Sequence, residues 1–240
     1  MLVIGHRGAS AYAPENTLSA LKLAVEQGAN GVEIDVQLTK DGKLVVIHDW
    51  KVDRTTNGKG YIYQLDFDYI RSLDCGSWFS EKFKGERVPT LKEVFEVVPK
   101  DVLLNIEIKE IERGRADIEK LVLKEIYEAD RLDSVVISSF HHSIIQSLHK
   151  LEPKLKLALL TASEILNLPK YLDDNGLVSY SYHPEINLIT KNTVKELEEK
   201  GIKTFVWTVN TVVDYQWLES IGVHGVITNY PDIMLKESNK

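Results

Sequence analysis

The chain has 240 residues, of which 43% are hydrophobic and 27% are charged, ordinary values for a globular protein. Its formal net charge is −7 and its basic residues are scattered, which argues against a nucleic-acid binder, because affinity for the phosphate backbone comes from clustered Lys and Arg. The only cysteine, Cys75, has no partner for an internal disulfide, so nothing in the sequence requires an oxidising compartment.

The sequence carries no signal for a membrane or for export. Its first residues, Met-Leu-Val-Ile-Gly-His-Arg-Gly, are not a basic leader followed by a long apolar stretch. The longest apolar runs are far shorter than the ~20 residues of a transmembrane helix. The chain also has no basic amphipathic stretch of the kind that attaches a protein to a membrane surface. We therefore predict a cytoplasmic protein without stable membrane association. Nothing in the sequence specifies its oligomeric state.

Apolar, β-branched segments recur along the chain, and stretches with helical periodicity separate them. Several of these segments are apolar throughout, which is typical of parallel strands covered on both faces. The predicted strands are Leu2–His6, Gly31–Leu38, Leu44–His48, Leu103–Lys109, Val135–Ser139, Lys156–Leu160, Leu177–Tyr182, Thr204–Val209 and Gly225–Thr228. The predicted helices are Thr17–Gln27, Thr90–Val98 with a capping box at Thr90 and Glu93, Ala116–Tyr127, His141–Leu151, Ser163–Asp173, Thr190–Lys200, Thr211–Ser220 and Pro231–Leu235.

The predicted strands are one more than the eight strands of an α/β barrel. The connection Thr39-Lys40-Asp41-Gly42 is too short for a parallel crossover of about a dozen residues, whereas Asp-Gly is typical of a hairpin. Leu44–His48 should therefore pair antiparallel with Gly31–Leu38, and the other strands should form a (β/α)8 TIM barrel of the α/β class. No linker divides the chain, so residues 1–240 are predicted to form one domain, with 49–87 as an inserted subdomain or lid.

Two predicted strands carry carboxylates on one face. Glu33 and Asp35 are two residues apart, as are Asn105 and Glu107, and side chains two apart along a strand point the same way. Carboxylates that converge inside a barrel repel one another unless a cation neutralises them. All-oxygen ligands favour Mg²⁺ or Ca²⁺, since zinc sites usually include His or Cys. The sequence therefore predicts one divalent cation bound by Glu33, Asp35 and Glu107.

Cationic and titratable side chains lie at the ends of the predicted strands Leu2–His6, Leu44–His48 and Leu103–Lys109, at the rim where barrel enzymes carry their catalytic groups. Arg7 and Lys109 are suited to bind phosphate oxygens. His6 and His48 can exchange protons near neutral pH, as a general base and a general acid. Each motif alone is also typical of an ion pair or a hydrogen-bonded core histidine. Together at one rim they favour phosphoryl transfer.

These residues also carry a resemblance to the glycerophosphodiester phosphodiesterases, which spans nearly the whole chain in order. The matching blocks are His6-Arg7-Gly8-Ala9, Ala13-Pro14-Glu15-Asn16-Thr17, Glu33 to Gly42, Val46-Ile47-His48-Asp49, Arg54-Thr55-Thr56-x-Gly58-x-Gly60, Pro89-Thr90-Leu91-x-Glu93-Val94, Asn105-Ile106-Glu107-Ile108-Lys109, Ser138-Ser139-Phe140, Trp207-Thr208-Val209-Asn210 and Gly225-Val226-Ile227-Thr228. The resemblance implies a TIM barrel with an insertion, and cleavage of a small glycerophosphodiester, such as glycerophosphocholine or glycerophosphoethanolamine, to sn-glycerol 3-phosphate and an alcohol.

The resemblance also implies roles for individual residues. In similar enzymes the residues matching Glu33, Asp35 and Glu107 bind Mg²⁺ or Ca²⁺, and those matching His6 and His48 act as acid and base. The remaining implied site residues hold the phosphate, lie near the site or shape its glycerol end: Arg7, Lys109, Glu15, Asn16, Phe140 and Trp207.

One position departs from the family pattern. The family usually has an Asp after the final Ile-Thr, where this chain has Asn229. Since all three metal carboxylates are present, we expect Asn229 to change local hydrogen bonding and not to abolish activity.

Two routes to the products remain open. In one, the glycerol 2-hydroxyl attacks phosphorus after His6 deprotonates it, His48 protonates the leaving alcohol, and water opens the cyclic phosphate. In the other, water attacks directly, and the two histidines can also exchange roles. A phospholipase-type phosphodiesterase on the same barrel and a non-catalytic binding barrel are the alternative functions. Retention of both histidines and all three carboxylates argues against a mere binder.

Overall fold

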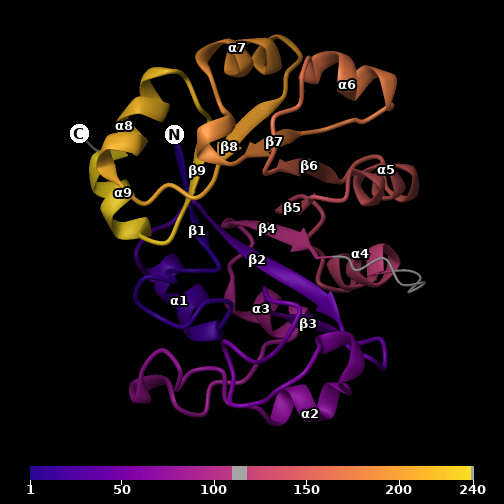
Figure 1. The fold of residues 1–240 in the computed structure, drawn as a ribbon, viewed down its shortest axis with the longest axis vertical. Helices are drawn as coiled ribbons and strands as arrows, with labels where there is room; N and C mark the ends of the chain where they lie inside the picture. The colour runs from indigo at the N-terminus through magenta and orange to yellow at the C-terminus, as the bar shows by residue number, and fades with distance from the viewer. Residues whose placement is uncertain (110–117, 239–240) are drawn as a thin grey trace.

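The computed structural model describes residues 1–109 and 118–238. Within them, eight parallel strands form a closed barrel surrounded by helices (Figure 1). The barrel strands are β1 (Leu2–His6), β2 (Gly31–Leu38), β4 (Leu103–Ile108), β5 (Val135–Ser139), β6 (Lys156–Thr161), β7 (Ser181–Pro184), β8 (Lys203–Val206) and β9 (Gly225–Thr228). β1 pairs with both β2 and β9, which closes the ring, so the predicted TIM barrel is confirmed.

The ninth strand, β3 (Leu44–Val46), lies outside the barrel ring. It pairs antiparallel with the end of β2, with Val36 opposite Val46 and Leu38 opposite Leu44. The predicted hairpin is therefore confirmed, although the strand ends two residues before His48.

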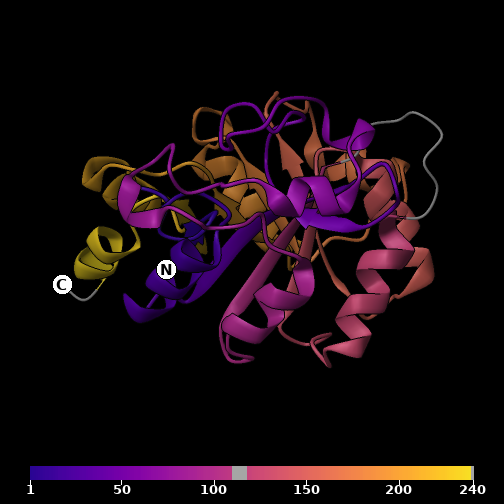
Figure 2. The same cartoon turned by 90° about the horizontal axis from the view of Figure 1, so that it is seen from below.

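Apart from α2 (Phe67–Ser72), which lies in residues 49–87, the described helices form the outer layer of the barrel, and Figure 2 shows the same molecule turned by 90°. The described helices are α1 (Leu18–Glu26), α2 (Phe67–Ser72), α3 (Leu91–Val97), α4 (Ile118–Glu128), α5 (His142–Leu151), α6 (Leu168–Asp174), α7 (Lys191–Glu199), α8 (Val212–Ser220) and α9 (Pro231–Ser238). The capping box at the start of α3 is confirmed: Thr90 accepts from the Glu93 backbone, and the Glu93 carboxylate accepts from the Thr90 backbone. The predicted start of α4, at Ala116, lies outside the described residues.

Two predicted elements begin several residues before the observed start, whereas the other starts within the described residues differ by at most about one residue. α6 begins at Leu168 and not at Ser163, because Asn167 is its N-cap and Pro169 is tolerated only in the first turn. β7 begins at Ser181 and not at Leu177. The Leu177 N–H instead bonds the Leu172 carbonyl at the end of α6, so this apolar residue closes the helix and does not start the strand.

Residues 49–87 follow β3 and lie on the side of the barrel next to it, with α2 at their surface (Figure 1). They also contain the 3₁₀ turns Ile62–Gln64 and Glu81–Phe83. Their apolar side chains share a small core with the β3 hairpin, made of Val45, Ile47, Val52, Ile62, Ile70, Leu73, Cys75 and Val88. Burial is the main cause that raises the pKa of the Cys75 thiol to about 12, so this cysteine is packed and unreactive.

The barrel interior contains a layer of apolar side chains and, next to it, a layer of polar side chains. Ile4, Phe205 and Ile227 pack together inside it with Trp207 against them. The strand register then places Glu33 opposite Asn105 and Asp35 opposite Glu107. The polar side chains therefore face one another near the carboxyl ends of the strands, on an apolar base.

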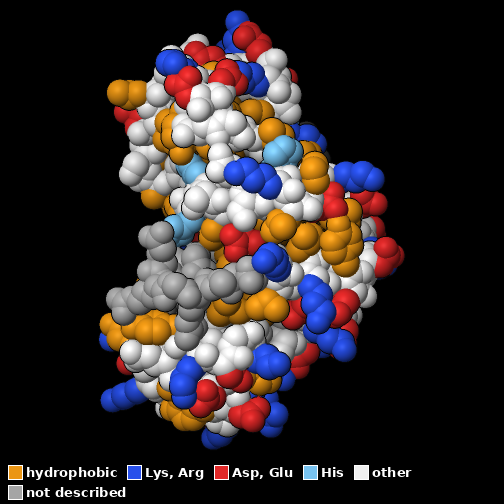
Figure 3. Space-filling view, turned by 90° about the vertical axis from the view of Figure 1, so that its right-hand side faces the viewer, with side chains coloured by type: hydrophobic (Ala, Val, Ile, Leu, Met, Phe, Trp, Pro, Cys, Tyr) orange, Lys and Arg blue, Asp and Glu red, His pale blue; other side chains and the backbone are white. Residues whose placement is uncertain are grey.

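The surface has no segregation of charge on the face drawn in Figure 3. Basic and acidic side chains alternate there over short distances, in agreement with the absence of a basic stripe in the sequence. Among the described residues, no helix combines the length and the apolar character needed to cross a bilayer.

Candidate active site

Glu33, Asp35 and Glu107 form a compact acidic cluster inside the barrel. One carboxylate oxygen of each lies within 4.8 Å of the others, and all three side chains are buried. β2 supplies the first two and β4 the third, so the predicted alternation along both strands brings them together. No other group of three such residues within ligand distance occurs in residues 1–109 and 118–238.

The electrostatics of this cluster favour a cation. Burial, followed by the charges of Asp35 and Glu107, raises the pKa of Glu33 well above its usual range. Burial and Asp35 raise the pKa of Glu107 to about 7. Burial opposes ionisation of Asp35 as well, but Lys109 and Arg7 hold the pKa of this carboxyl below its usual range. Because a bound divalent ion replaces such protons, the residues present fit an oxygen-liganded metal.

His6 closes β1 and lines the cavity above the acidic cluster. Its Nδ1 lies 2.7 Å from Asn229 Oδ1, which also accepts a hydrogen bond of 3.0 Å from the Ser10 hydroxyl. The carboxamide oxygen only accepts, so Nδ1 carries the proton and Nε2 is left as an acceptor. Burial, and then the positive charge of Arg7, lowers the pKa of His6 to about 4. His6 is therefore neutral at physiological pH.

His48 reaches the same cavity from the loop after β3. Its Nδ1 lies 2.8 Å from Asp49 Oδ1. Burial lowers the pKa of His48, although Asp35 opposes this effect. The backbone at His48 is held by Gln37, whose Nε2 lies 2.8–3.0 Å from the carbonyl oxygens of Ile47, His48 and Asp49. The histidine is thus fixed through both its ring and its backbone.

Arg7 and Lys109 place positive charge beside the acidic cluster. The Lys109 ammonium lies 2.6 Å from Glu107 Oε1 and 3.3 Å from Asp35 Oδ1. Arg7 Nε lies 3.4 Å from Asp35 Oδ2, and the Arg7 backbone N–H donates to Glu33 at 2.9 Å. These two cations therefore border the site where an anion would meet the metal.

Glu15 and Asn16 lie in the loop after β1 and contact these groups directly. Glu15 accepts from Arg7 Nη1 at 2.7 Å. Asn16 donates to Asp35 Oδ2 at 2.8 Å and accepts from the Asp35 backbone N–H at 3.2 Å. This two-point contact fixes the orientation of the Asp35 carboxylate. Asn16 adopts a left-handed backbone with φ 57°, a conformation that Asn tolerates better than most residues.

Phe140 and Trp207 form the aromatic side of the cavity. Their ring centroids are 5.6 Å apart in an edge-to-face contact, and the Lys109 ammonium lies 5.8 Å from the Phe140 centroid. The Trp207 indole N–H donates to the His183 carbonyl at 2.9 Å. His183, in β7, is fully buried and is not among the residues that line the cavity.

The structure thus brings all the residues expected at the site to one end of the barrel. The cavity there has a volume of about 110 Å³. Its lining residues are His6, Arg7, Glu33, His48, Asn105, Glu107, Lys109, Phe140, Leu160, Trp207 and Ile227. Asp35, Glu15 and Asn16 lie behind this wall and reach it through the contacts given above.

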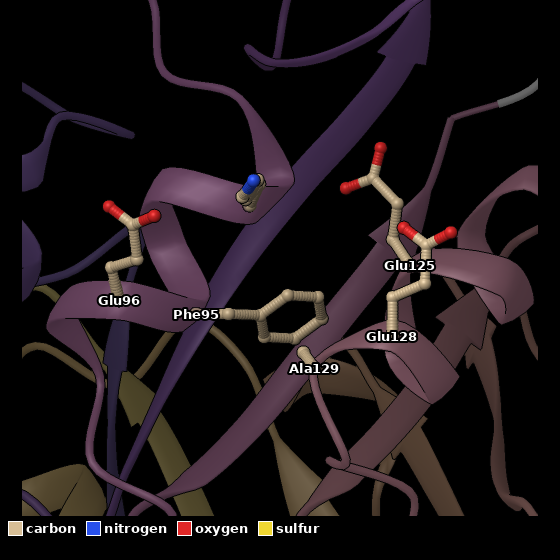
Figure 4. A pocket seen from close by; sticks show the side chains of 6 residues that line it. Phe95, Glu96, Glu125, Glu128 and Ala129 are labelled. Atoms are coloured by element: carbon tan, nitrogen blue, oxygen red, sulfur yellow. The ribbon is translucent and has the colours of Figure 1, made fainter.

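A second cavity, of about 390 Å³, lies on the outer surface between α3 and α4 (Figure 4). The Phe95 ring extends from α3 toward Ala129, while Glu125 and Glu128 come from α4 and Glu96 points away from them. It is larger than the barrel cavity, but the described residues that line it include no histidine or arginine. The chemistry is therefore better supported at the barrel mouth.

Gln37 and Arg54 were given no role at the site from the residues alone, and Asn105 was only placed on the strand face of Glu107. Gln37 continues the series Glu33, Asp35 along β2, so strand alternation was the signal for it. Asn105 is 1% exposed, lines the cavity and has no hydrogen-bond partner at either amide atom, which marks it as a group that meets a ligand or water. Arg54, which lies in the insertion, contacts the carboxylates of Asp49 and Glu15, and no local sequence pattern predicts these contacts.

Comparison with known proteins agrees with this geometry. Residues 6–233 match the model of the glycerophosphoryl diester phosphodiesterase family. The chain belongs to this family. It is accordingly a phosphoric diester hydrolase, and the resemblance seen in the sequence is confirmed.

Individual family members are similar over their whole length. A glycerophosphodiester phosphodiesterase of Caldanaerobacter subterraneus subsp. tengcongensis is 44% identical over 235 residues, which cover 98% of this chain and 96% of the relative. A solved Oleispira antarctica phosphodiesterase, in complex with the product sn-glycerol-3-phosphate, has a TM-score of 0.94 at 29% identity and covers 100% of this chain and 97% of its own. The glycerophosphodiester phosphodiesterase of Thermotoga maritima has a TM-score of 0.78 at 31% identity, with coverage of 99% and 98%.

Proposed function

We propose that this family member hydrolyses glycerophosphodiesters, such as glycerophosphocholine and glycerophosphoethanolamine, to sn-glycerol 3-phosphate and an alcohol. The observation that carries the proposal is the position of the acidic cluster, two cationic side chains and two histidines around one cavity. The product bound by the Oleispira antarctica phosphodiesterase supports the same product here. Residues 49–87 would be an insertion within a single barrel domain, covering one side of its mouth.

The proposal includes one divalent cation, Mg²⁺ or Ca²⁺, held by Glu33, Asp35 and Glu107. When bound, such an ion neutralises negative charge on the reacting phosphate group. The carboxylate pair Asp35 and Glu107 is held in place on its other side by Lys109, and Asn16 fixes the rotation of Asp35. The support is therefore a preorganised, all-oxygen ligand set.

Arg7 and Lys109 would bind the nonbridging phosphate oxygens. Arg7 is oriented for this role by Glu15, and Lys109 by Glu107. Phe140 and Trp207 present apolar ring surface in the wall of the cavity beside Lys109, which suits the carbon chain of glycerol. The phosphate group would then contact the cations while the glycerol carbons contact the aromatic pair.

His6 and His48 would transfer the protons. Neutral His6, with its free Nε2, accepts the proton of the glycerol 2-hydroxyl as its oxygen bonds to phosphorus. His48 gives a proton to the oxygen of the departing alcohol when the bond from phosphorus to that oxygen breaks. Water then opens the cyclic phosphate with the roles exchanged, which restores both histidines. Asp49 beside His48 favours the protonated ring that this first step requires.

A substrate analogue separates this route from direct attack by water. A glycerophosphodiester that lacks the 2-hydroxyl cannot form the five-membered cyclic phosphate, so we expect no detectable cleavage of it under conditions where glycerophosphocholine is consumed. The products are followed by phosphorus NMR, which also detects a cyclic phosphate. Cleavage of the analogue at a rate similar to that of glycerophosphocholine would favour direct attack by water.

The function itself is tested with the purified protein, Mg²⁺ or Ca²⁺, and a panel of glycerophosphodiesters. We expect release of sn-glycerol 3-phosphate, measured by a coupled enzymatic assay. A phospholipid presented in vesicles serves as the comparison substrate, and we expect no release of its headgroup. Absence of product from every glycerophosphodiester would overturn the proposal, and preferential cleavage of the phospholipid would indicate a phospholipase-type reaction.

A further inference from the structure

Arg54, from the insertion, makes charge-assisted hydrogen bonds to two carboxylates at once. Its Nε and Nη2 donate to Asp49 at 2.7 and 2.9 Å, and its Nη1 and Nη2 donate to Glu15 at 2.8 and 2.7 Å. The planar guanidinium allows this paired geometry on both sides, which an ammonium group does not. Arg54 is therefore bound in a fixed orientation between two loops of the barrel mouth.

Each of these carboxylates also holds a residue of the proposed reaction. Asp49 lies 2.8 Å from Nδ1 of His48. Glu15 accepts from Arg7 at 2.7 Å, and Arg7 in turn lies 3.4 Å from Asp35. A continuous chain of charged contacts thus runs from the proton-transfer histidine, through Arg54, to the phosphate-binding arginine and a metal carboxylate.

A purely structural ion pair is the alternative explanation. The Arg54 side chain is 46% exposed, and exposed ion pairs contribute little to folding stability. Its side chain donates hydrogen bonds to the two loops that carry the site. Its guanidinium carbon lies 5.9 Å from the ring centroid of Trp78, an aromatic side chain that is itself exposed. The contacts are therefore placed to orient site residues more than to join core elements.

We propose that Arg54 is a positioning residue that orients His48 through Asp49 and Arg7 through Glu15, so that a single guanidinium aligns the proton-transfer and phosphate-binding sides of the site. This inference rests on the proposed phosphodiester hydrolysis. It assigns the insertion a direct part in organising the site, in addition to covering it. The two branches predict separable kinetic effects.

In Arg54→Gln, the two carboxylates lose their shared partner. We expect kcat to fall about 10–100-fold, because misplacement of a reacting group by about 1 Å has effects of this size, and KM to rise as Arg7 loses its fixed orientation. Asp49→Asn should mainly lower kcat and Glu15→Gln should mainly raise KM, since each breaks one branch. The affinity for sn-glycerol 3-phosphate, measured by calorimetry, should fall in Arg54→Gln and Glu15→Gln but change little in Asp49→Asn.

Arg71→Gln is the matched control. Arg71 lies in α2 of the same insertion and forms an ion pair of 2.6 Å with Glu93, away from the barrel cavity. We expect it to alter the unfolding temperature without changing kcat or KM. Addition of guanidinium ion at millimolar concentration should restore part of the activity of Arg54→Ala, because the site is exposed, and should not affect the wild type.

The outcomes separate this inference from the proposed function. If the wild type is active and Arg54→Gln matches it in kcat, KM and product affinity, Arg54 does not position the site, and the proposed function stands. If Arg54→Gln loses activity only to the extent that it unfolds, the structural alternative holds and the inference is overturned. If the wild type cleaves no glycerophosphodiester, both are overturned.

Discussion

Alanine in place of either His6 or His48 is expected to lower kcat about 10²–10⁴-fold, the usual contribution of one positioned acid or base. Each imidazole is already oriented by a partner at Nδ1, Asn229 for His6 and Asp49 for His48, so its Nε2 is left for the substrate. KM should change far less, since neither histidine is a main source of phosphate binding. The rates are measured by release of sn-glycerol 3-phosphate at saturating substrate.

The double alanine variant should be only slightly slower than the slower single variant, because two groups that act on one proton-transfer sequence are not additive. His149→Ala, in α5 on the outside of the barrel, is the control and should retain wild-type kcat. A single variant at His6 or His48 with turnover within a few-fold of the wild type would contradict the proton-transfer scheme.

Replacement of Glu107 by glutamine is expected to weaken the binding of Mg²⁺ or Ca²⁺ by at least about 100-fold, because even the outer hydrogen-bond partners of metal ligands contribute 10–100-fold. The substitution preserves shape and removes one of three clustered charges. Affinity is measured by calorimetry on protein treated with a chelator. Glu125→Gln is the control, since Glu125 is a half-buried carboxyl with a raised pKa in the outer cavity, and its loss should leave metal affinity unchanged.

The same variant should change how stability depends on pH. The pKa of Glu107 is about 7 in the folded protein and near 4.5 when exposed, so the folded state binds the extra proton. The wild type therefore has this stabilisation below about pH 4.5 and loses it as the pH rises through about 7. Glutamine does not titrate, so Glu107→Gln should lose less stability than the wild type between these limits, and it should also lower the pKa of Glu33, which the Glu107 charge raises.

This difference is measured by denaturant unfolding of both proteins in chelator at pH 4.5 and pH 8. The lowered pKa of His6 has the opposite effect on stability, but it is common to both proteins and cancels in the comparison. Addition of metal at pH 8 should stabilise the wild type and not the variant. An equal response of the two proteins to pH and to metal would contradict the assignment of Glu107 as a metal ligand.

The arrangement of the acidic cluster could be predicted because it depends on a local rule. Side chains alternate along a strand, so Glu33 and Asp35 had to share a face, and the third member, Glu107, followed from the same rule in β4. The strand pairing then places Asp35 opposite Glu107. Apolar runs and short turns were likewise sufficient for the barrel and its hairpin, because both depend on local composition.

Other parts depend on contacts between residues far apart, which local patterns do not encode. The loop that carries His48 is shaped by Gln37, eleven residues away in the sequence, through bonds to backbone carbonyls. The late start of β7 has the same origin, because Leu177 is apolar whether it ends a helix or begins a strand. Arg54 meets Glu15 across thirty-nine residues, so its place at the site follows only from the folded chain.

The most direct test of the account is a titration of chelator-treated protein with Mg²⁺ or Ca²⁺ in which metal binding and release of sn-glycerol 3-phosphate from glycerophosphocholine are measured together. We predict that activity is absent at the start and rises in proportion to binding of one ion per chain. Full activity without metal would contradict the role of Glu33, Asp35 and Glu107. Binding of one ion without any product would contradict the proposed hydrolysis.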